Sequence, residues 1–151
     1  MSVVYALCNQ KGGVGKSTTA FQLARAAVLR GLRVLVVDAD PQGNLTAVAA
    51  AEPVGDDQVG LADALSERTP ETTRDVIVPG VWDRLDVVPT SGVTLGHVRD
   101  ELEIAGAGRE ARLRAALGQV AGDYDVILID CAPSLDQLTV NALTAAGGAV
   151  V

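Results

Sequence analysis

The chain has 151 residues, of which 48% are hydrophobic and 21% are charged, and this composition excludes an intrinsically disordered chain. The length suits one domain, residues 1–151, and leaves no room for a second domain of ordinary size. Twelve basic and nineteen acidic residues give a net charge of −7. This charge argues against a surface built mainly to bind phosphate backbones, although a local basic patch is compatible with it.

The first predicted element is a short apolar strand. Residues 3–7 are rich in β-branched side chains and lead into a glycine-rich segment, which indicates a buried strand. Residues 17–30 carry apolar side chains at helical spacing, and Gly31 follows where a glycine commonly ends a helix. Residues 33–38 form a second apolar run before a turn that contains proline and glycine. The chain is therefore predicted to begin as strand, helix and strand.

The middle of the chain has weaker patterns. Between residues 49 and 80 we predict only a short helix over residues 60–67 and a polar connection rich in threonine. A third strand follows over residues 85–89. Two helical patterns then cover residues 93–103 and 109–121.

The last part of the chain contains the most strongly apolar segment. Residues 124–130, YDVILID, are predicted to form a strand, residues 137–146 a helix, and residues 148–151 the start of a strand that the chain does not finish. Strands that alternate with helices imply right-handed βαβ units, and strands that are apolar on both faces are buried on both faces. We therefore predict an α/β fold, a doubly wound and mostly parallel sheet with helices on both faces.

The N-terminal region carries no predicted targeting signal. MSVVYALCNQ has no basic region and only a short apolar run, which argues against a secretory signal, and no apolar run reaches the ~18 residues that span a bilayer. The two cysteines, Cys8 and Cys131, form no disulfide framework, so the cytoplasm is the expected compartment. We interpret both as small buried apolar residues.

A glycine-rich segment, NQKGGVGKSTT over residues 9–19, joins the first predicted strand to the first predicted helix. Glycines allow close approach of the backbone to a ligand, and successive N–H groups at a helix N-terminus form an anion site. Lys16 is expected to reach the β- and γ-phosphates of a nucleotide, and the Ser17 hydroxyl to bind Mg²⁺. The alternative is a glycine-rich turn that binds no ligand. The nucleotide-binding residues predicted here are Lys11, Gly12, Gly13, Val14, Gly15, Lys16, Ser17 and Thr18.

The strict P-loop pattern requires glycine at position 10, where this chain has Gln10 followed by Lys11. KGGVGKST, residues 11–18, instead resembles the deviant Walker A motif of the family that includes the ParA, Soj and MinD ATPases. The resemblance implies that Lys11 reaches across a dimer interface to the phosphates of the partner's nucleotide. Lys11 and Lys16 are the only lysines among the twelve basic residues, which supports chemical roles for both because lysine and arginine are not interchangeable.

Acidic residues end two of the predicted strands. VVDADPQGN, residues 36–44, contains Asp38 and Asp40, and YDVILIDCAPSL, residues 124–135, contains Asp130. Ligands of open α/β sheets bind outside the carboxyl ends of the strands, so these carboxylates are expected to face a Mg²⁺–phosphate site. A solvated aspartate-rich turn is the alternative for the first segment. The resemblance implies that Asp40 positions the attacking water and that Asp38 helps organise the magnesium site, while Asp130 holds Mg²⁺ through water as a Walker B aspartate.

Other polar residues favour ordinary structural roles. The only histidine, His97, is predicted to be a partly exposed helix residue. Arg109, Arg112 and Arg114 are predicted to form a solvated helix face, paired with Glu110 among others, rather than a DNA-binding patch.

The resemblance covers nearly the whole chain and implies a partition ATPase of the ParA/Soj type. Such a protein binds ATP and Mg²⁺, forms an ATP-sandwich homodimer, and hydrolyses ATP weakly without a partner. The implied catalytic residues are Lys11, Lys16 and Asp40, and the implied metal-binding residues are Ser17, Asp38 and Asp130. A ParB-like protein and non-specific DNA are the implied partners in the segregation of plasmid or chromosomal DNA, and the implied location is cytoplasmic and nucleoid-associated.

Two alternatives belong to other functional classes. A MinD-like, membrane-associated positioning ATPase would need a C-terminal amphipathic helix, and none precedes Val151. A non-hydrolysing nucleotide-binding fragment or regulatory protein would use the fold only for interaction. Because the chain ends inside a predicted strand and matches only the N-terminal part of the family's domain, we expect the fold to be truncated at its C-terminus.

Overall fold

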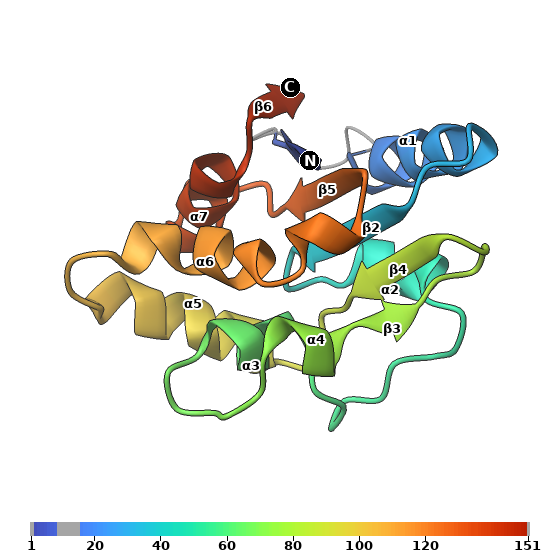
Figure 1. Cartoon of the computed structure of the whole chain (residues 1–151). Helices are drawn as coiled ribbons and strands as arrows, with labels where there is room; N and C mark the ends of the chain where they lie inside the picture. The colour runs from blue at the N-terminus through green and yellow to red at the C-terminus, as the bar shows by residue number, and fades with distance from the viewer. Residues whose placement is uncertain (1, 9–15, 151) are drawn as a thin grey trace.

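The structure, a computed structural model, describes residues 2–8 and 16–150, and the side chain of Lys16 lies outside that description. Six strands form one sheet (Figure 1). They are β1 (Val3–Leu7), β2 (Val34–Ala39), β3 (Val78–Pro79), β4 (Leu85–Val88), β5 (Val126–Cys131) and β6 (Gly148–Val150). Their order across the sheet is β3-β4-β2-β5-β1-β6. Every pair of neighbours is parallel except β3 and β4, which are antiparallel at one edge.

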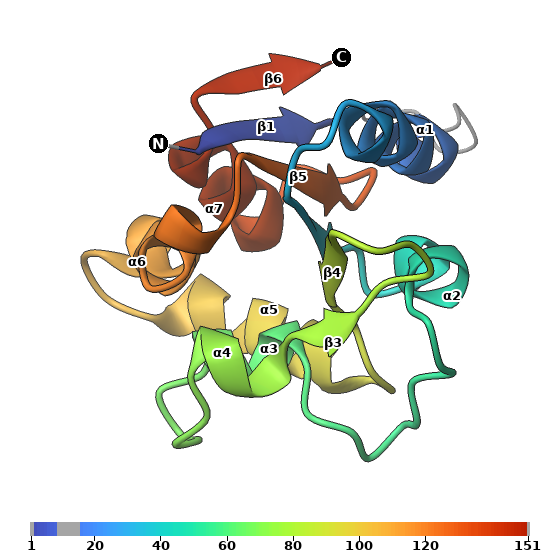
Figure 2. The same cartoon turned by 45° about the vertical axis from the view of Figure 1, so that its right-hand side comes forward.

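Helices cover both faces of the sheet, as Figure 2 shows. The helices are α1 (Lys16–Leu29), α2 (Asn44–Ala49), α3 (Leu61–Leu65), α4 (Thr73–Val76), α5 (Thr94–Ile104), α6 (Arg112–Gly118) and α7 (Gln137–Ala145), with 3₁₀ turns η1 (Arg109–Ala111) and η2 (Ala121–Asp123). Helices α1 and α2 lie on one face, and α3, α5, α6 and α7 lie on the other. The predicted doubly wound α/β fold is confirmed.

The central strands supply apolar side chains to two separate cores. All six residues of β2 are buried, and alternate positions point to opposite faces of the sheet. Val34 and Val36 pack with α1 and α2, whereas Leu35 and Val37 pack with the helices of the other face. Burial on both faces explains why β2 and β5 are apolar without a period of two residues.

Three elements in the middle of the chain were missed by the sequence analysis. Helices α2 and α4 contain six and four residues, too few turns to produce a clear apolar stripe. The edge strand β3 has two residues and ends in Pro79, a residue that sequence patterns place outside central strands. The helix predicted over residues 109–121 is also divided, because α6 ends at Gly118 and 3₁₀ turns flank it.

The carboxyl ends of three parallel strands lie side by side at one edge of the sheet. Leu7 of β1 is level with Asp130 of β5, and Asp130 is level with Asp38 of β2. The segments that follow these strands therefore begin next to one another.

Among the helices of the described residues, none combines the length and apolar character that crossing a membrane requires.

Candidate functional site

The predicted phosphate-binding segment connects β1 to α1, as expected for a strand–loop–helix site. Residues 9–15 of this segment, which include Lys11, Gly12, Gly13, Val14 and Gly15, lie outside the described residues, and so does the side chain of Lys16. Their roles therefore stay predictions. The described part of the site begins at Ser17, which is half-buried, and at Thr18, which is exposed in the first turn of α1.

Ser17 and Asp130 are brought into direct contact. The Ser17 hydroxyl donates a hydrogen bond of 2.6 Å to Oδ2 of Asp130, across 113 positions of sequence. Helix α1 packs against β5, so its first turn lies at the carboxyl end of that strand. Two residues that were predicted to share a magnesium site thus lie within hydrogen-bond distance of each other.

Asp38 lies beside Asp130 on the neighbouring strand. The two residues are level with each other in β2 and β5, and the side chains of both are fully buried. The pKa of Asp38 is raised to about 7 in total: burial is the largest cause, the nearby charge of Asp130 acts in the same direction, and hydrogen bonds from Thr46 and Asp40 oppose both. Two adjacent buried carboxylates create a region of negative potential that favours a bound cation or a bound proton.

A hydrogen-bond network holds the Asp38 carboxylate in place. Oδ2 accepts hydrogen bonds from the backbone N–H of Thr46 at 2.8 Å and from its hydroxyl at 2.6 Å. Oδ1 accepts one from the N–H of Asp40 at 3.2 Å. Thr90, which follows β4, donates its N–H to the Thr46 hydroxyl at 3.0 Å and its hydroxyl to the Asp38 carbonyl at 2.7 Å. The network joins β2, α2 and the segment after β4.

Thr46 and Thr90 are site residues that the sequence analysis missed. Both are buried, but neither belongs to a glycine-rich or acidic motif. Thr46 is in α2, an element too short to be predicted, and Thr90 is 52 residues from Asp38. Only the packing of α2 and β4 against β2 brings them to the aspartate.

Asp40 forms a tight turn directly after β2. Its Oδ1 accepts a hydrogen bond of 3.0 Å from the N–H of Gln42, an arrangement that favours a turn over continuation of the strand. Gly43 then adopts a positive φ of 70° immediately before α2, a backbone conformation that glycine tolerates best. Because only 5% of Asp40 is exposed, the alternative of a solvated turn is wrong.

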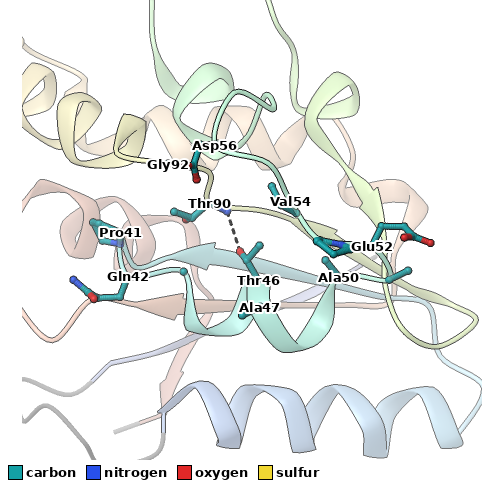
Figure 3. Close-up of a pocket in the computed structure, with 13 residues that line it drawn as sticks. Pro41, Gln42, Thr46, Ala47, Ala50, Glu52, Val54, Asp56, Thr90 and Gly92 are labelled. Atoms are coloured by element: carbon teal, nitrogen blue, oxygen red, sulfur yellow. Dashed lines mark hydrogen bonds between the residues drawn. The ribbon is translucent and has the colours of Figure 1, made fainter.

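A cleft of about 580 Å³ adjoins this network (Figure 3). Its walls are the segment over residues 41–43, helix α2, the segment over residues 50–56, and Thr90 with Gly92. Figure 3 shows the hydrogen bond between Thr90 and Thr46 at its wall. The described residues that line the cleft include none of the four predicted site residues Ser17, Asp38, Asp40 and Asp130. The cleft therefore borders the aspartate network from the side of α2.

The donor set at the strand ends suits magnesium. Mg²⁺ prefers oxygen ligands and commonly uses one or two carboxylates together with water and substrate phosphates. Ser17, Asp38 and Asp130 supply one hydroxyl and two carboxylates. Within residues 2–8 and 16–150, no group of three or more histidine, cysteine, aspartate or glutamate side chains gathers as a metal site. The described histidine, cysteine, aspartate and glutamate side chains therefore do not form a complete metal site by themselves. A magnesium site completed by water and phosphate oxygens is compatible with this result.

The arginines near α6 are more structural than predicted. Arg112 donates to Glu101 at 3.1 Å and pairs with Glu67 at 3.2 Å, and its side chain is only 16% exposed. Arg109 donates to the carbonyl of Glu103 at 2.7 Å near the end of α5, and Arg114 is exposed. The predicted solvated position is therefore wrong for Arg112, whose guanidinium is largely buried, whereas the predicted pairing with acidic residues holds through Glu101 and Glu67.

Known proteins are similar to this chain over almost its whole length. The sequence profile of a family described as AAA domain matches residues 2–151. The sporulation initiation inhibitor protein Soj of Bacillus subtilis is 41% identical over 100% of this chain and 58% of its own length. The chromosome partitioning protein ParA of Caulobacter vibrioides is 42% identical over 98% of this chain and 54% of its own.

A solved structure extends the comparison to three dimensions. Cobyrinic acid a,c-diamide synthase from Mycobacterium smegmatis, crystallised with an ATP analogue and magnesium, superposes with a TM-score of 0.87. It is 38% identical, over 99% of this chain and 59% of that protein. The chain thus spans little more than half the length of the relatives that it matches.

Proposed function

The chain belongs to the AAA domain family and is of the ParA/Soj type, and from this premise we propose that it is a magnesium-dependent ATPase that acts in DNA partition. The observation that carries the proposal is the Ser17–Asp130 hydrogen bond with Asp38 level beside it, at the end of the strand–loop–helix segment. The name of the Caulobacter vibrioides relative, chromosome partitioning protein ParA, supports partition as the process. The ATP analogue and magnesium in the solved relative support the cofactors.

We propose that Ser17, Asp38 and Asp130 organise the magnesium site. When bound there, Mg²⁺ would neutralise charge on the β- and γ-phosphates. The hydroxyl of Ser17 and the carboxylate of Asp130 already lie 2.6 Å apart, so both can face one ion. A cation at this position favours the ionised form of Asp38, whose pKa burial raises. Asp38, held by Thr46, would then contribute a fixed negative charge to the site.

The phosphate chain of ATP is proposed to bind Lys11, Gly12, Gly13, Val14, Gly15, Lys16, Ser17 and Thr18. Backbone N–H groups before a helix N-terminus bind anions, and lysine adds a compact positive charge. Within this set Lys16 would bind the nucleotide of its own subunit. Lys11 would contact the nucleotide of the partner in a homodimer.

Asp40 is proposed to orient the attacking water. One of its oxygens, Oδ1, accepts the N–H of Gln42, which fixes the orientation of the carboxylate. Within the described residues no hydrogen bond occupies Oδ2, so this oxygen can accept one from water. Catalysis in this class of reaction rests on positioning and charge neutralisation, and a carboxylate whose orientation is fixed can supply positioning.

The two lysines give the sharpest test of this proposal. Lys16→Ala should abolish ATP binding, whereas Lys11→Ala should leave binding intact and remove ATP-dependent dimerisation. Binding is measured by calorimetry with a non-hydrolysable ATP analogue, and dimerisation by sedimentation velocity with and without the analogue. Lys11→Arg is the matched control for charge. Intact ATP-dependent dimers of the Lys11→Ala variant would sink the sandwich-dimer model.

Phosphate release separates the proposal from its rivals. We propose weak turnover alone and faster turnover with non-specific DNA and a ParB-like partner, in a cytoplasmic and nucleoid-associated protein. Magnesium-dependent ATP binding without turnover under any of these conditions would favour a non-hydrolysing regulatory protein. ATP-dependent binding to anionic lipid vesicles, with no effect of DNA, would favour the MinD-like alternative.

A further inference from the structure

Cys8 and Cys131 face each other across two neighbouring strands. Leu7 is level with Asp130 in the parallel pair β1–β5, and Cys8 and Cys131 are the residues that directly follow these two. Their Sγ atoms lie 2.8 Å apart. This separation is shorter than an ordinary contact between sulfur atoms, and only about 0.8 Å longer than a disulfide bond.

The cysteine pair adjoins two parts of the candidate site, the glycine-rich segment and Asp130. Cys8 directly precedes the glycine-rich segment, and Cys131 directly follows Asp130, which accepts the Ser17 hydroxyl. The backbone N–H of Cys8 also donates to the carbonyl of Val150 in β6 at 2.9 Å. A covalent bond between the two sulfurs would tie the entry of the phosphate segment to the strand that carries Asp130.

The two thiols differ in access to solvent. Cys131 is only 1% exposed, whereas Cys8 is partly exposed. An oxidant from solution therefore reaches Cys8 first, and Cys131 is placed to resolve the product. The interpretation of both residues as small buried apolar groups holds for Cys131 but not for Cys8, which is only partly buried.

We propose that Cys8 and Cys131 form a redox-sensitive pair that a peroxide converts to an intramolecular disulfide. The sulfur of Cys8 attacks one peroxide oxygen, which forms a sulfenic acid and releases one water. The sulfur of Cys131 then attacks the Cys8 sulfur, the S–O bond breaks, and the hydroxyl leaves as water with the proton of Cys131. Two thiols lose two electrons, and hydrogen peroxide is reduced to two molecules of water.

The strand geometry supports closure of this bond. Adjacent strands are ~4.8 Å apart, which falls within the Cα–Cα range that disulfides span. The two cysteines are 123 positions apart in sequence, so the unfolded chain rarely brings them together. The fold itself thus creates the pair, which is the arrangement expected of a reversible redox sensor in a reducing compartment.

The test uses the whole chain, reduced and freed of reductant, and then treated with equimolar hydrogen peroxide. Free thiols are blocked with an alkylating reagent, and non-reducing peptide maps are read by mass spectrometry. We expect one linked peptide that contains Cys8 and Cys131, loss of two hydrogen atoms from the chain, and full reversal by dithiothreitol. Formation of the linkage should fall at least about tenfold in concentrated urea, because the loop must then close from a disordered chain.

Two variants and three outcomes complete the test. Cys8→Ser and Cys131→Ala should each abolish the linked peptide, and circular dichroism confirms that each variant is folded. Linkage between two chains, oxidation of Cys8 to the sulfinic acid with Cys131 still alkylated, or equal linkage in urea would each overturn the proposal. These readouts require no nucleotide, so their failure is distinguishable from failure of the proposed ATPase function.

The consequence for the site rests on the proposed function. The disulfide should lower the affinity for the ATP analogue and Mg²⁺ by about tenfold, which corresponds to ~1.4 kcal/mol. The affinity should return on reduction, and it should not respond to peroxide in Cys8→Ser. An affinity unchanged by a proven disulfide would overturn this regulatory consequence.

Discussion

Some residues of the candidate site can be predicted from a sequence motif, whereas others are brought to the site only by tertiary packing. Ser17, Asp38 and Asp130 follow from the glycine-rich segment and from the acidic ends of apolar strands, and the structure brings all three together. Thr46 and Thr90 could not be predicted, because threonine in a short or irregular segment has no distinctive pattern. Yet these two residues hold Asp38 in place, because Thr46 donates two hydrogen bonds to its carboxylate and Thr90 donates one to its backbone carbonyl.

Thr46→Val tests this supporting role at nearly constant volume. The change removes the hydroxyl donor to Asp38 and leaves the buried N–H of Thr90 without its acceptor. Unsatisfied buried groups cost ~1–3 kcal/mol each, so we expect a loss of that order in the free energy of unfolding, measured by urea denaturation. Thr46→Ser keeps the hydroxyl and should lose less. A loss in Thr46→Ser with little or no loss in Thr46→Val would show that packing of the methyl group, and not the hydrogen bonds, is what matters.

At the scale of elements, length and periodicity decide what can be predicted. The strands β1, β2, β4, β5 and β6 and the helices α1, α3, α5 and α7 lie close to their predicted ranges, because apolar strands buried on both faces and longer amphipathic helices have clear signals. Helix α2 has six residues and no such signal. Its role in the site depends on Gly43, whose left-handed backbone turns the chain back over the end of β2.

The junction of α3, α5 and α6 depends on an ion pair that sequence alone did not indicate. Glu101 in α5 accepts hydrogen bonds from Ser66 at 3.1 Å and from Arg112 at 3.1 Å. Burial acts to raise the pKa of Glu101, but the hydrogen bonds from Ser66, Glu67 and Arg112 outweigh it, and the net pKa is lowered. A lowered pKa means that the ionised form stabilises the folded state.

Glu101→Gln should therefore destabilise the fold in a pH-dependent way. The stabilisation by Glu101 is fully present above the ordinary glutamate pKa of 4.5, and it is lost as the pH falls below that value through the folded-state pKa. We expect a loss of ~1 kcal/mol at pH 7, measured by urea denaturation, and a difference from the wild type that vanishes in acid. Glu110→Gln is the matched control, because Glu110 is exposed and forms no ion pair within the described residues. A pH-independent difference would assign the effect to packing.

At the scale of the whole molecule, the order of the strands in the sheet determines which residues lie together in the candidate site. Strands β1, β5 and β2 are distant in sequence but adjacent in the sheet, and their shared direction puts Cys8, Asp130 and Asp38 at one edge. Sequence patterns predict parallel strands, and the rule that ligands bind at carboxyl ends predicts the edge. The order of strands, which decides that Asp130 is flanked by β1 and β2, depends on long-range packing and is available only from the structure.

A ligand that joins α1, β5 and the phosphate segment should stabilise the whole fold. Binding to the folded state alone raises the free energy of unfolding by ~2.7 kcal/mol at a ligand concentration of 100 times Kd. We therefore expect a non-hydrolysable ATP analogue to raise the Tm in the presence of Mg²⁺, and to raise it much less when EDTA removes the metal. Differential scanning calorimetry of the whole chain measures both effects.

Asp130→Asn decides whether this stabilisation passes through the proposed metal site. The amide oxygen can still accept the Ser17 hydroxyl, so the fold should persist without ligand, but the negative charge that favours Mg²⁺ is lost. The magnesium-dependent part of the Tm increase should therefore disappear in this variant. Asp57→Asn makes the same change of charge at an exposed position and should behave as the wild type. If Asp130→Asn keeps the full magnesium-dependent increase, Asp130 does not hold the metal, and the Ser17–Asp130 hydrogen bond is only a structural link between α1 and β5.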